Sequence, residues 1–329
     1  MPRELSALQY SYLIDFIEKM NVSESFIRQR VLQGIALNRT PGFHYVGNFL
    51  RPSFDHVSAQ NVSMSLNVGP HNADRDGNVN FGALLVFADL AIAANVRAAH
   101  DRAARLATVN MHMHFTGAPM TGLIEAKTTV HGYLVDSLGR QGAGSISLTA
   151  GGQPVGFGTG AFMVLDPPKG VALYPMELRS EKDPEVPALA VEALEPDELL
   201  IWQRAEAALQ SNENQSFVNR FFGFDTRAED FGAVGELKNG AHVGNRVGHL
   251  QGGITMGLGM ATAERALNKD WRVSAVSAWF ISPGEGPVIS ARSTILHRGR
   301  LTAVVRTEIT GLNNRRTMEM VTTHAKKMS

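Results

Sequence analysis

The sequence contains no cysteine, and this absence excludes several kinds of structure and chemistry. A disulfide framework, a cysteine zinc site and a thiol nucleophile all need that residue. An excess of charge of one sign is missing too, because 31 Lys and Arg balance 31 Asp and Glu. A neutral chain has little general attraction for nucleic acid or for an anionic membrane, so we expect neither as a partner.

Long apolar runs and a recognisable targeting signal are absent as well. No uninterrupted apolar stretch approaches the ~18 residues that a membrane helix needs, so we expect no membrane span. The segment MPRELSALQYSYLIDFIEKM is amphipathic and contains acidic residues, unlike a signal peptide, and we expect a cytoplasmic protein. What is present is a chain of 329 residues, 44% hydrophobic and 19% charged, which is typical of a globular protein with two or more domains.

The order of predicted elements occurs twice along the chain. Residues 1–50 indicate helices, and a strand-like run follows from about residue 58. Next come the apolar helix 80–97 and four strand-like runs, at 107–115, 123–134, 142–150 and 153–165. A segment rich in proline and charge and then a helix make up residues 168–215, which is typical of a linker.

The second half repeats this order. It has a strand-like stretch near 230–240, a helix at 250–267 and four strand-like runs, at 273–281, 287–297, 301–310 and 317–325. The two long helices correspond without gaps, because Asp89 lies nine residues after Asn80 and Met260 lies nine residues after Gln251. An apolar helix of this length needs a sheet around it.

We therefore predict an α+β fold with two tandem domains, each a long central helix wrapped by an antiparallel sheet. The predicted boundaries are 51–167 for the first domain and 216–329 for the second. The linker 168–215 joins them, and an N-terminal helical extension at 1–50 precedes them.

The second long helix begins with the motif NRVGHLQGG at 245–253. A strand, this glycine-containing motif, a buried helix and four antiparallel strands resemble the hotdog fold. Specifically, they resemble the acyl-CoA thioesterases of the phenylacetate and human thioesterase-superfamily type. The motif of that family reads Asn-x-x-Gly-x-x-His-Gly-Gly, with an Asp eight residues after the first paired glycine. The resemblance implies a double hotdog, whose two halves form a pseudo-dimer within one chain.

In the second half, the resemblance implies the part of the site that holds the substrate carbonyl. Asn245 and the backbone amide of Gly252 would polarise a thioester carbonyl, and Gly253 would help to bind the substrate. Gln251 stands where the family usually has His. A helix N-terminus has unpaired amides and a positive dipole end, which suit a carbonyl oxygen that gains negative charge.

In the first half, the resemblance implies the part that acts on water. Asp89 would be a general base or a nucleophile, and Thr108 would orient the water. Phe81 occupies the place of the key glycine there, while Met260 occupies the place of Asp89 in the second half. Because eight helical residues span roughly 12 Å, Asp89 cannot serve a carbonyl at the start of its own helix. We expect it to act with Gly252, from an antiparallel helix, in one composite site.

Other interpretations of these residues stay open. Asp89 could be structural, although an unpaired charge in an apolar helix is costly, and burial would raise its pKa toward that of a useful base. Gly252 and Gly253 could simply begin a helix that packs tightly against a strand. Thr108 could be an ordinary β-branched strand residue.

The remaining predictions concern ligands. Arg140, Arg298 and Arg300 lie in predicted turns and could bind the phosphates of coenzyme A, or could be ordinary solvated arginines. His112 and His114 share one face of a strand, but no third ligand accompanies them, so we predict no metal. With a coenzyme A thioester as substrate we expect no cofactor. Hotdog pairs commonly assemble further, and the resemblance therefore implies a homo-oligomer of the fused chain.

Three functions are consistent with this pattern. The first is hydrolysis of an acyl-CoA thioester. The second is a catalytically degenerate protein that binds acyl-CoA or serves in assembly, because several motif positions are substituted. The third is an enoyl-CoA hydratase, which is disfavoured because the Asp-x-Asn-Pro-x-His pattern of hydratase-type hotdog proteins is missing from both helix starts.

Overall fold

A computed structural model of the protein describes residues 7–134, 140–211 and 215–327. The strands of the first half are β1 (Ser53–Val57), β2 (Asn61–Asn67), β3 (Arg105–Phe115), β4 (Leu123–Tyr133), β5 (Gln141–Ala150) and β6 (Gln153–Leu165). Those of the second half are β7 (Asp225–Glu229), β8 (Gly232–Lys238), β9 (Trp271–Phe280), β10 (Val288–Arg298), β11 (Thr302–Thr310) and β12 (Arg316–Lys326).

Six α-helices lie within the described residues. They are α1 (Ala7–Asn38), α2 (Tyr45–Leu50), α3 (Phe81–Ala98), α4 (Pro196–Gln210), α5 (Phe217–Phe222) and α6 (Gly252–Ala266), together with short 3-10 turns at Val191–Ala193 and Leu312–Asn314. The long helices α3 and α6 confirm the two predicted central helices to within two residues at each end.

All the strands belong to one antiparallel sheet in the order β1-β2-β4-β5-β6-β3-β9-β12-β11-β10-β8-β7. The two halves of this order mirror each other around the pairing of β3 with β9, which runs from Asn110 opposite Trp279 to His114 opposite Ala275. The large antiparallel sheet and the four strands after each long helix confirm those predictions.

Each half opens with two strands, whereas the sequence pattern predicts only one, so this expectation was wrong. The missed strands, β1 and β7, are the two edges of the sheet. Their sequences, SFDHV and DTRAE, carry polar residues without apolar alternation, and the side chains of β7 are mostly exposed. Edge strands keep such polar side chains because they face solvent, and the period-two signal is then lost.

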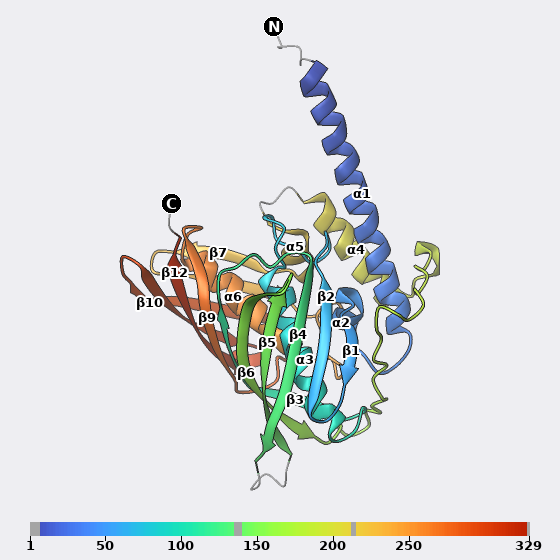
Figure 1. The fold of residues 1–329 in the computed structure, drawn as a ribbon, viewed down its shortest axis with the longest axis vertical. Coiled ribbons are helices and arrows are strands. Elements are labelled where there is room, and N and C mark those ends of the chain that lie inside the picture. The colour runs from blue at the N-terminus through green and yellow to red at the C-terminus, as the bar shows by residue number, and fades with distance from the viewer. Residues whose placement is uncertain (1–6, 135–139, 212–214, 328–329) are drawn as a thin grey trace.

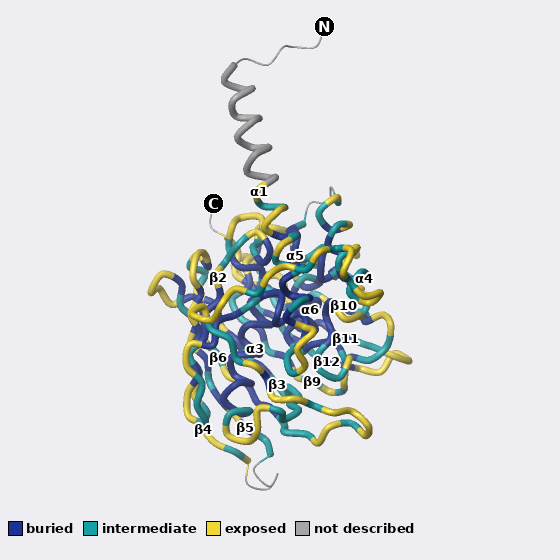
Figure 2. Tube along the Cα trace, turned by 90° about the vertical axis from the view of Figure 1, so that its right-hand side faces the viewer, coloured by how far each residue is buried: buried dark blue, intermediate teal, exposed yellow. Residues whose placement is uncertain are grey.

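The sheet curves around α3 and α6, which lie side by side in the interior (Figure 1). Both helices are dark blue in the burial view, and the strands surround them (Figure 2). Small residues bring the helices together, since a Cβ added at Gly253 would lie 2.4 Å from Val86 Cα and one added at Gly257 would lie 2.9 Å from Gly82 Cα. The later position of α6 faces the earlier position of α3, so the two helices are antiparallel. The first turn of each helix therefore lies beside the body of the other.

The apolar helix α3 has the length and composition of a membrane span, with a mean hydropathy of 1.6 over its 18 residues. However, 83% of that stretch is buried inside the protein. The sheet therefore provides the apolar surroundings that such a helix needs, as it does for the core helix of a globular fold.

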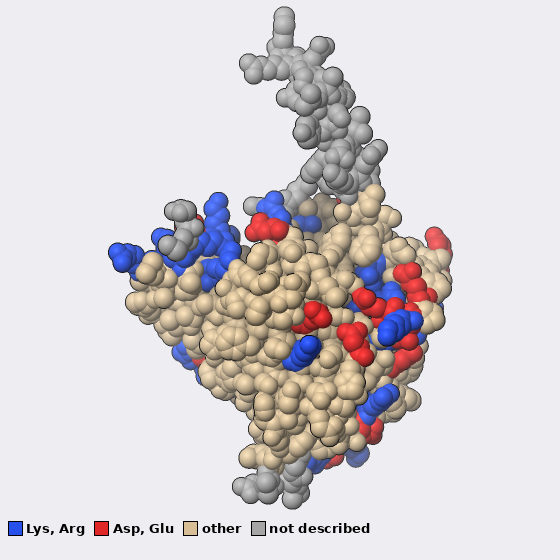
Figure 3. All heavy atoms as spheres, viewed as in Figure 1, with Lys and Arg blue, Asp and Glu red and all other residues tan. Residues whose placement is uncertain are grey.

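The N-terminal helices pack against the segment that connects the two halves. Arg28 Nε of α1 donates to Glu206 Oε1 of α4 at 2.8 Å, and Arg39 Nε donates to Glu198 Oε1 at 2.8 Å. Every residue of α2 is buried. On the outer surface, charged side chains of both signs are interspersed, with broad uncharged surface over the strands that face the viewer in Figure 3.

Candidate active site

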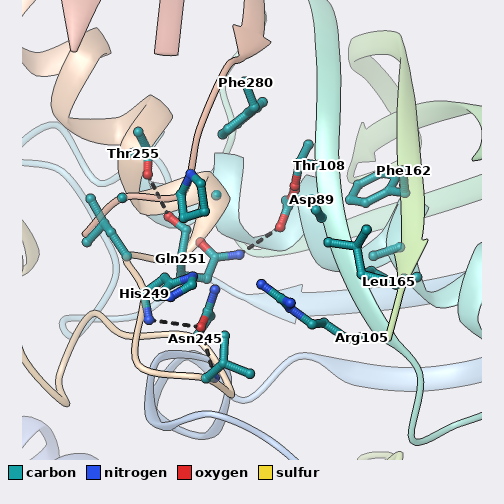
Figure 4. Close-up of a pocket in the computed structure, with 18 of the residues that line it drawn as sticks. Asp89, Arg105, Thr108, Phe162, Leu165, Asn245, His249, Gln251, Thr255 and Phe280 are labelled. Atoms are coloured by element: carbon teal, nitrogen blue, oxygen red, sulfur yellow. Dashed lines mark hydrogen bonds between the residues drawn. The ribbon is translucent and has the colours of Figure 1, made fainter. Parts of the chain in front are cut away.

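Asp89 lies in the middle of α3 with only 6% of its surface exposed. Thr108 Oγ1 of β3 donates to Asp89 Oδ1 at 2.8 Å, and Gln251 Nε2 donates to Asp89 Oδ2 at 2.7 Å (Figure 4). Both carboxylate oxygens are therefore hydrogen-bonded. Gln251 comes from the second half of the chain, whereas Asp89 and Thr108 come from the first. Both halves therefore donate a hydrogen bond to this carboxylate.

A β-bulge accompanies Thr108. The pairing of β3 with β6 shifts register between Thr108 and Asn110. A bulge bends the strand and re-aims nearby side chains, which accounts for a threonine that faces the helix at this point. The pairing of β9 with β12 shifts at the corresponding place, but the residue there is the apolar Val273.

Gln251 connects the carboxylate to the start of α6. It is the N-cap of that helix, and its Oε1 accepts from the Ile254 N–H at 2.9 Å. The same side chain has an amide nitrogen left over, which it donates to Asp89. The Gln251 side chain thus provides both a helix cap and a fixed donor to the carboxylate.

Burial raises the pKa of Asp89 from 3.8 to about 6. The hydrogen bond from Thr108, the positive charge of Arg97 and the hydrogen bond from Gln251 all act in the opposite direction, because each favours the ionised carboxylate. The result is a buried carboxyl group that is ionised at neutral pH and titrates close to it, which is the behaviour of a general base.

Gly252 is the first residue of α6 and lies directly against this group. A Cβ at position 252 would lie 2.9 Å from Thr108 Oγ1 and 3.3 Å from Asp89 Oδ1, closer than ordinary contacts allow. The first amides of a helix have no intrahelical acceptor. Glycine therefore leaves the helix start open beside the carboxylate.

Asn245 lines the same cavity, and part of its side chain shapes the loop before α6. Its Oδ1 accepts from the N–H groups of Val247 and His249 at 3.0 and 3.1 Å. The amide nitrogen of Asn245 is the part left to donate to a ligand. Asp74 shapes the matching loop of the first half in the same way, through its own Oδ1.

The cavity beside Asp89 has a volume of about 380 Å³. Apolar side chains form much of its wall, among them Leu90, Ala93, Phe162, Leu165 and Phe280. Two of its polar residues come from outside the predicted motif, Arg97 and Arg105, and a third, Arg246, occupies a variable motif position. None of these arginines was predicted from the sequence. Arg97 was readable, however, because it follows Asp89 by eight residues and so lies near the same face of the helix.

The N-terminal extension and the connecting segment also reach the cavity. His44 and Leu173 are both part of its wall. His44 Nδ1 accepts from the Gly47 N–H at 3.0 Å as the N-cap of α2, and burial lowers its pKa to about 3. Parts of the chain that the motif comparison did not explain therefore help to close the site.

Four predicted binding residues lie elsewhere, and none of them is part of the cavity wall. Gly253 lies at the crossing of α6 with α3, against the Val86 backbone, so it packs against a helix and not against the strand of the alternative interpretation. The exposed Arg140 pairs with Asp166 at 2.7 Å. Arg298 lies over the ring of Trp271 at 6.0 Å, and Arg300 is exposed.

The start of α3 and the middle of α6 form the region equivalent to the candidate site, and they carry different side chains. Phe81, at the start of α3, packs edge-on against Phe115 with ring centroids 5.1 Å apart. Met260, at the place of Asp89, is 1% exposed, and Val273 is buried beside it in the core. A second cavity, of about 630 Å³, lies here. The α6 residue in its wall that corresponds to Asp89 is Met260, which has a thioether in place of a carboxylate.

The described residues include no cluster of three or more His, Cys, Asp or Glu side chains that could hold a metal ion. The two candidate histidines are engaged with aromatic rings. His112 lies 5.3 Å from the ring of Trp279, and His114 stacks on Phe157 at 5.2 Å. This arrangement is typical of strand histidines on the surface of a sheet.

Neither a family model nor a curated protein sequence matches the chain. Solved structures do match. A protein from Novosphingobium aromaticivorans, provisionally named a thioesterase, is 13% identical with a TM-score of 0.53, over 88% of this chain and 100% of that one. The 12:0-ACP thioesterase from Umbellularia californica is 9% identical with a TM-score of 0.52, over 81% and 94% of the two chains.

A third similar structure is a hot-dog-fold protein from Alicyclobacillus acidocaldarius. It is 7% identical with a TM-score of 0.52, and the match covers 84% of this chain and 96% of that one. Structural similarity at such low sequence identity supports a shared fold but not a shared chemistry. The chain has the hotdog fold, as its sequence pattern predicted.

Proposed function

We propose that the protein hydrolyses acyl-CoA thioesters at one composite site between its two halves. The observation that carries this proposal is the contact of Asp89, from the middle of α3, with the start of α6 at Gln251 and Gly252. In this proposal the halves are tandem hotdog domains that form a pseudo-dimer, and each contributes what the other lacks.

The reaction needs a base and a set of hydrogen-bond donors. The Asp89 carboxylate takes a proton from water, and the water oxygen attacks the thioester carbon. The Gly252 N–H and the Asn245 amide nitrogen donate to the carbonyl oxygen as it gains negative charge. The C–S bond then breaks, and the proton passes to the departing thiolate. Thr108 and Gln251 keep the carboxylate in one orientation throughout.

A covalent route uses the same groups. Asp89 would attack the thioester carbon directly, form an anhydride and release the thiol, and water would then cleave the anhydride. Single turnover in water enriched in heavy oxygen distinguishes the two routes. The anhydride route allows the label to enter the Asp89 side chain when water attacks on that side, whereas general-base catalysis sends it only into the product acid.

Two further observations favour a hydrolase. Burial raises the pKa of Asp89 to about 6, so the carboxylate is ionised at neutral pH and still basic enough to accept a proton. The similar protein from Umbellularia californica is named an acyl-ACP thioesterase, which indicates that this fold accommodates thioester chemistry. Assembly into a homo-oligomer and a cytoplasmic location stay predictions from the sequence.

The test is the Asp89→Asn variant, with release of free thiol measured from a panel of acyl-CoA thioesters. We expect kcat to fall by about 10³-fold, within the range usual for loss of a general base. Asp225→Asn, on the exposed edge strand β7, is the matched control and should keep full activity.

Equal, background release from the wild type and Asp89→Asn, together with tight binding of acyl-CoA by both, would contradict hydrolysis and favour the acyl-CoA binding protein. Loss of enoyl-CoA absorbance without thiol release would favour a hydratase.

A further inference from the structure

Two arginines meet at one backbone carbonyl in the wall of the cavity. Arg97 Nε of α3 donates to the Ala104 carbonyl oxygen at 3.4 Å, and Arg246 Nη1, from the loop before α6, donates to the same oxygen at 3.3 Å. Arg246 Nη2 also donates to the Tyr174 carbonyl. Backbone carbonyls from two segments therefore hold the two guanidinium groups side by side.

No carboxylate in the described part of the chain forms an ion pair with either group. The nearest opposing charges that act on them are those of Asp89 for Arg97 and of Asp101 for Arg246. Burial and mutual repulsion lower the pKa of Arg97 to about 10. Both arginines are partly buried and line the cavity. Like charges placed together in a half-buried wall are costly unless an anion joins them.

A direct path leads from the reacting group to this pair. Asp89 and Arg97 lie eight residues apart on α3, so their Cα atoms are about 12 Å apart. Helical side chains lean toward the N-terminus, which brings the Arg97 guanidinium nearer to Asp89 than that. Besides the charged Arg105, the cavity wall includes the apolar side chains of Leu90, Ala93, Leu106, Phe162 and Leu165.

The apolar wall distinguishes two sources of an anion. The phosphates of coenzyme A are joined to its sulfur by the pantetheine arm, whose two amides and hydroxyl group need hydrogen-bond partners. That arm, when extended, is also longer than the path. An acyl chain consists of methylene groups and suits the apolar wall. The cavity wall also includes Ser282 and Thr317, whose hydroxyl groups suit the polar pantetheine arm.

We propose that the acyl chain of the substrate ends in a carboxylate, which binds between Arg97 and Arg246. The substrate class is then an ω-carboxyacyl thioester, and the protein cleaves the thioester end while the two guanidinium groups hold the other end. This inference rests on the proposed hydrolase function, because Asp89 defines the reacting end of the cavity.

The test measures binding of two non-hydrolysable thioether analogues by calorimetry. One is the analogue of adipoyl-CoA, and the other is its methyl ester, which has the same chain without the charge. We expect the carboxylate analogue to bind about tenfold or more tightly, as hydrogen bonds between charged groups allow. Arg97→Met and Arg246→Met should each remove most of this preference. Arg227→Met, on the edge strand β7, should leave it unchanged.

Equal affinity of the wild type for the two analogues would overturn the proposal. So would an Arg97→Met variant that weakens both analogues equally, since the anion would then be a phosphate of coenzyme A. Arg97→Lys keeps the charge, and it should retain part of the preference even if Arg97→Met does not fold. Because binding is measured without turnover, a failure to hydrolyse any acyl-CoA would contradict the proposed function and leave this result to be judged separately.

Discussion

The starts of α3 and α6 are two versions of one structure. Asn80 caps α3 by accepting from the Gly82 N–H at 2.9 Å, and Gln251 caps α6 by accepting from the Ile254 N–H at 2.9 Å. The Asn80 amide nitrogen donates to Asn219 Oδ1 at 2.9 Å, whereas the Gln251 amide nitrogen donates to Asp89 Oδ2 at 2.7 Å. One additional methylene group thus allows the second cap to contact a carboxylate from the other half.

A duplicated fold can specialise through its side chains while the backbone turns before its central helices stay the same. Gly77 and Gly248 have φ angles of 80° and 81°, so the two loops keep the same turn. Only the side chains differ: Phe81 fills the space that Gly252 leaves open, and Met260 stands where the other helix has Asp89.

The variant Met260→Asp places a carboxylate where the other helix has one. Val273 cannot donate to it as Thr108 does to Asp89, and Asn80 is engaged with Asn219. We expect the free energy of unfolding at neutral pH to fall by about 4 kcal/mol, as for an uncompensated buried charge. Urea unfolding measures this, and Met260→Leu, of similar volume, should cost under about 1.5 kcal/mol. Equal stability of the two variants would mean that this position has polar partners.

The variant Gly252→Val fills the space that α6 leaves beside Asp89. Its side chain would press on Thr108 and the carboxylate, so we expect kcat/KM for acyl-CoA to fall by about 10²–10³-fold. Phe81→Val, at the equivalent first position of α3, should leave kcat/KM unchanged. Thiol release at matched protein concentration compares them, and a Gly252→Val enzyme of full activity would remove Gly252 from the site.

Asp89→Asn should stabilise the protein in a pH-dependent way. Because the folded-state pKa is about 6 and the usual value is 3.8, ionisation opposes folding, and its cost grows as pH rises from about 4 to about 6. Above that range the variant should be more stable than the wild type by about 2 to 3 kcal/mol, and below pH 4 the two should converge. Thermal or urea unfolding across this range is the measurement. A variant that is less stable than the wild type above pH 6 would mean instead that the carboxylate is stabilised in the folded state.

Gln251→Asn shortens the second cap to match the first. The hydrogen bond from Gln251 lowers the pKa of Asp89, so its loss should raise that pKa and shift the rise of kcat/KM with pH to higher values. Near pH 6 we expect a rate about tenfold below that of the wild type. A pH–rate profile measures the shift, and movement of the midpoint to lower pH would contradict the role assigned to Gln251.

Much of this fold was readable from the sequence because its elements are long and repeated. The helices α3 and α6 carry apolar residues throughout, and their shared register remains visible despite differing side chains. The edge strands β1 and β7 were not readable, since exposed polar residues remove the alternating pattern. Their positions depend on pairing with β2 and β8, which local sequence does not record.

The candidate site was readable in part. The resemblance and the helix spacing predicted that Asp89 and Thr108 would face Gly252 and Asn245. The structure brings Asp89, Thr108 and Gly252 together beside the cavity that Asn245 lines, and it adds the contact of Gln251 with Asp89. Arg140, Arg298 and Arg300 seemed suited to phosphate by charge alone, but charge does not reveal which turn faces the cavity. Arg246 lies inside the motif at a variable position, so only its three-dimensional neighbours identify it.

The pairing of β3 with β9 has a consequence for how the site behaves on dilution. A site shared between separate subunits disappears when those subunits dissociate, so its activity per molecule depends on protein concentration. Here a covalent chain and a continuous hydrogen-bonded seam join the two contributors. The candidate site therefore stays assembled at any concentration at which the chain stays folded, and both of its contributors belong to one molecule.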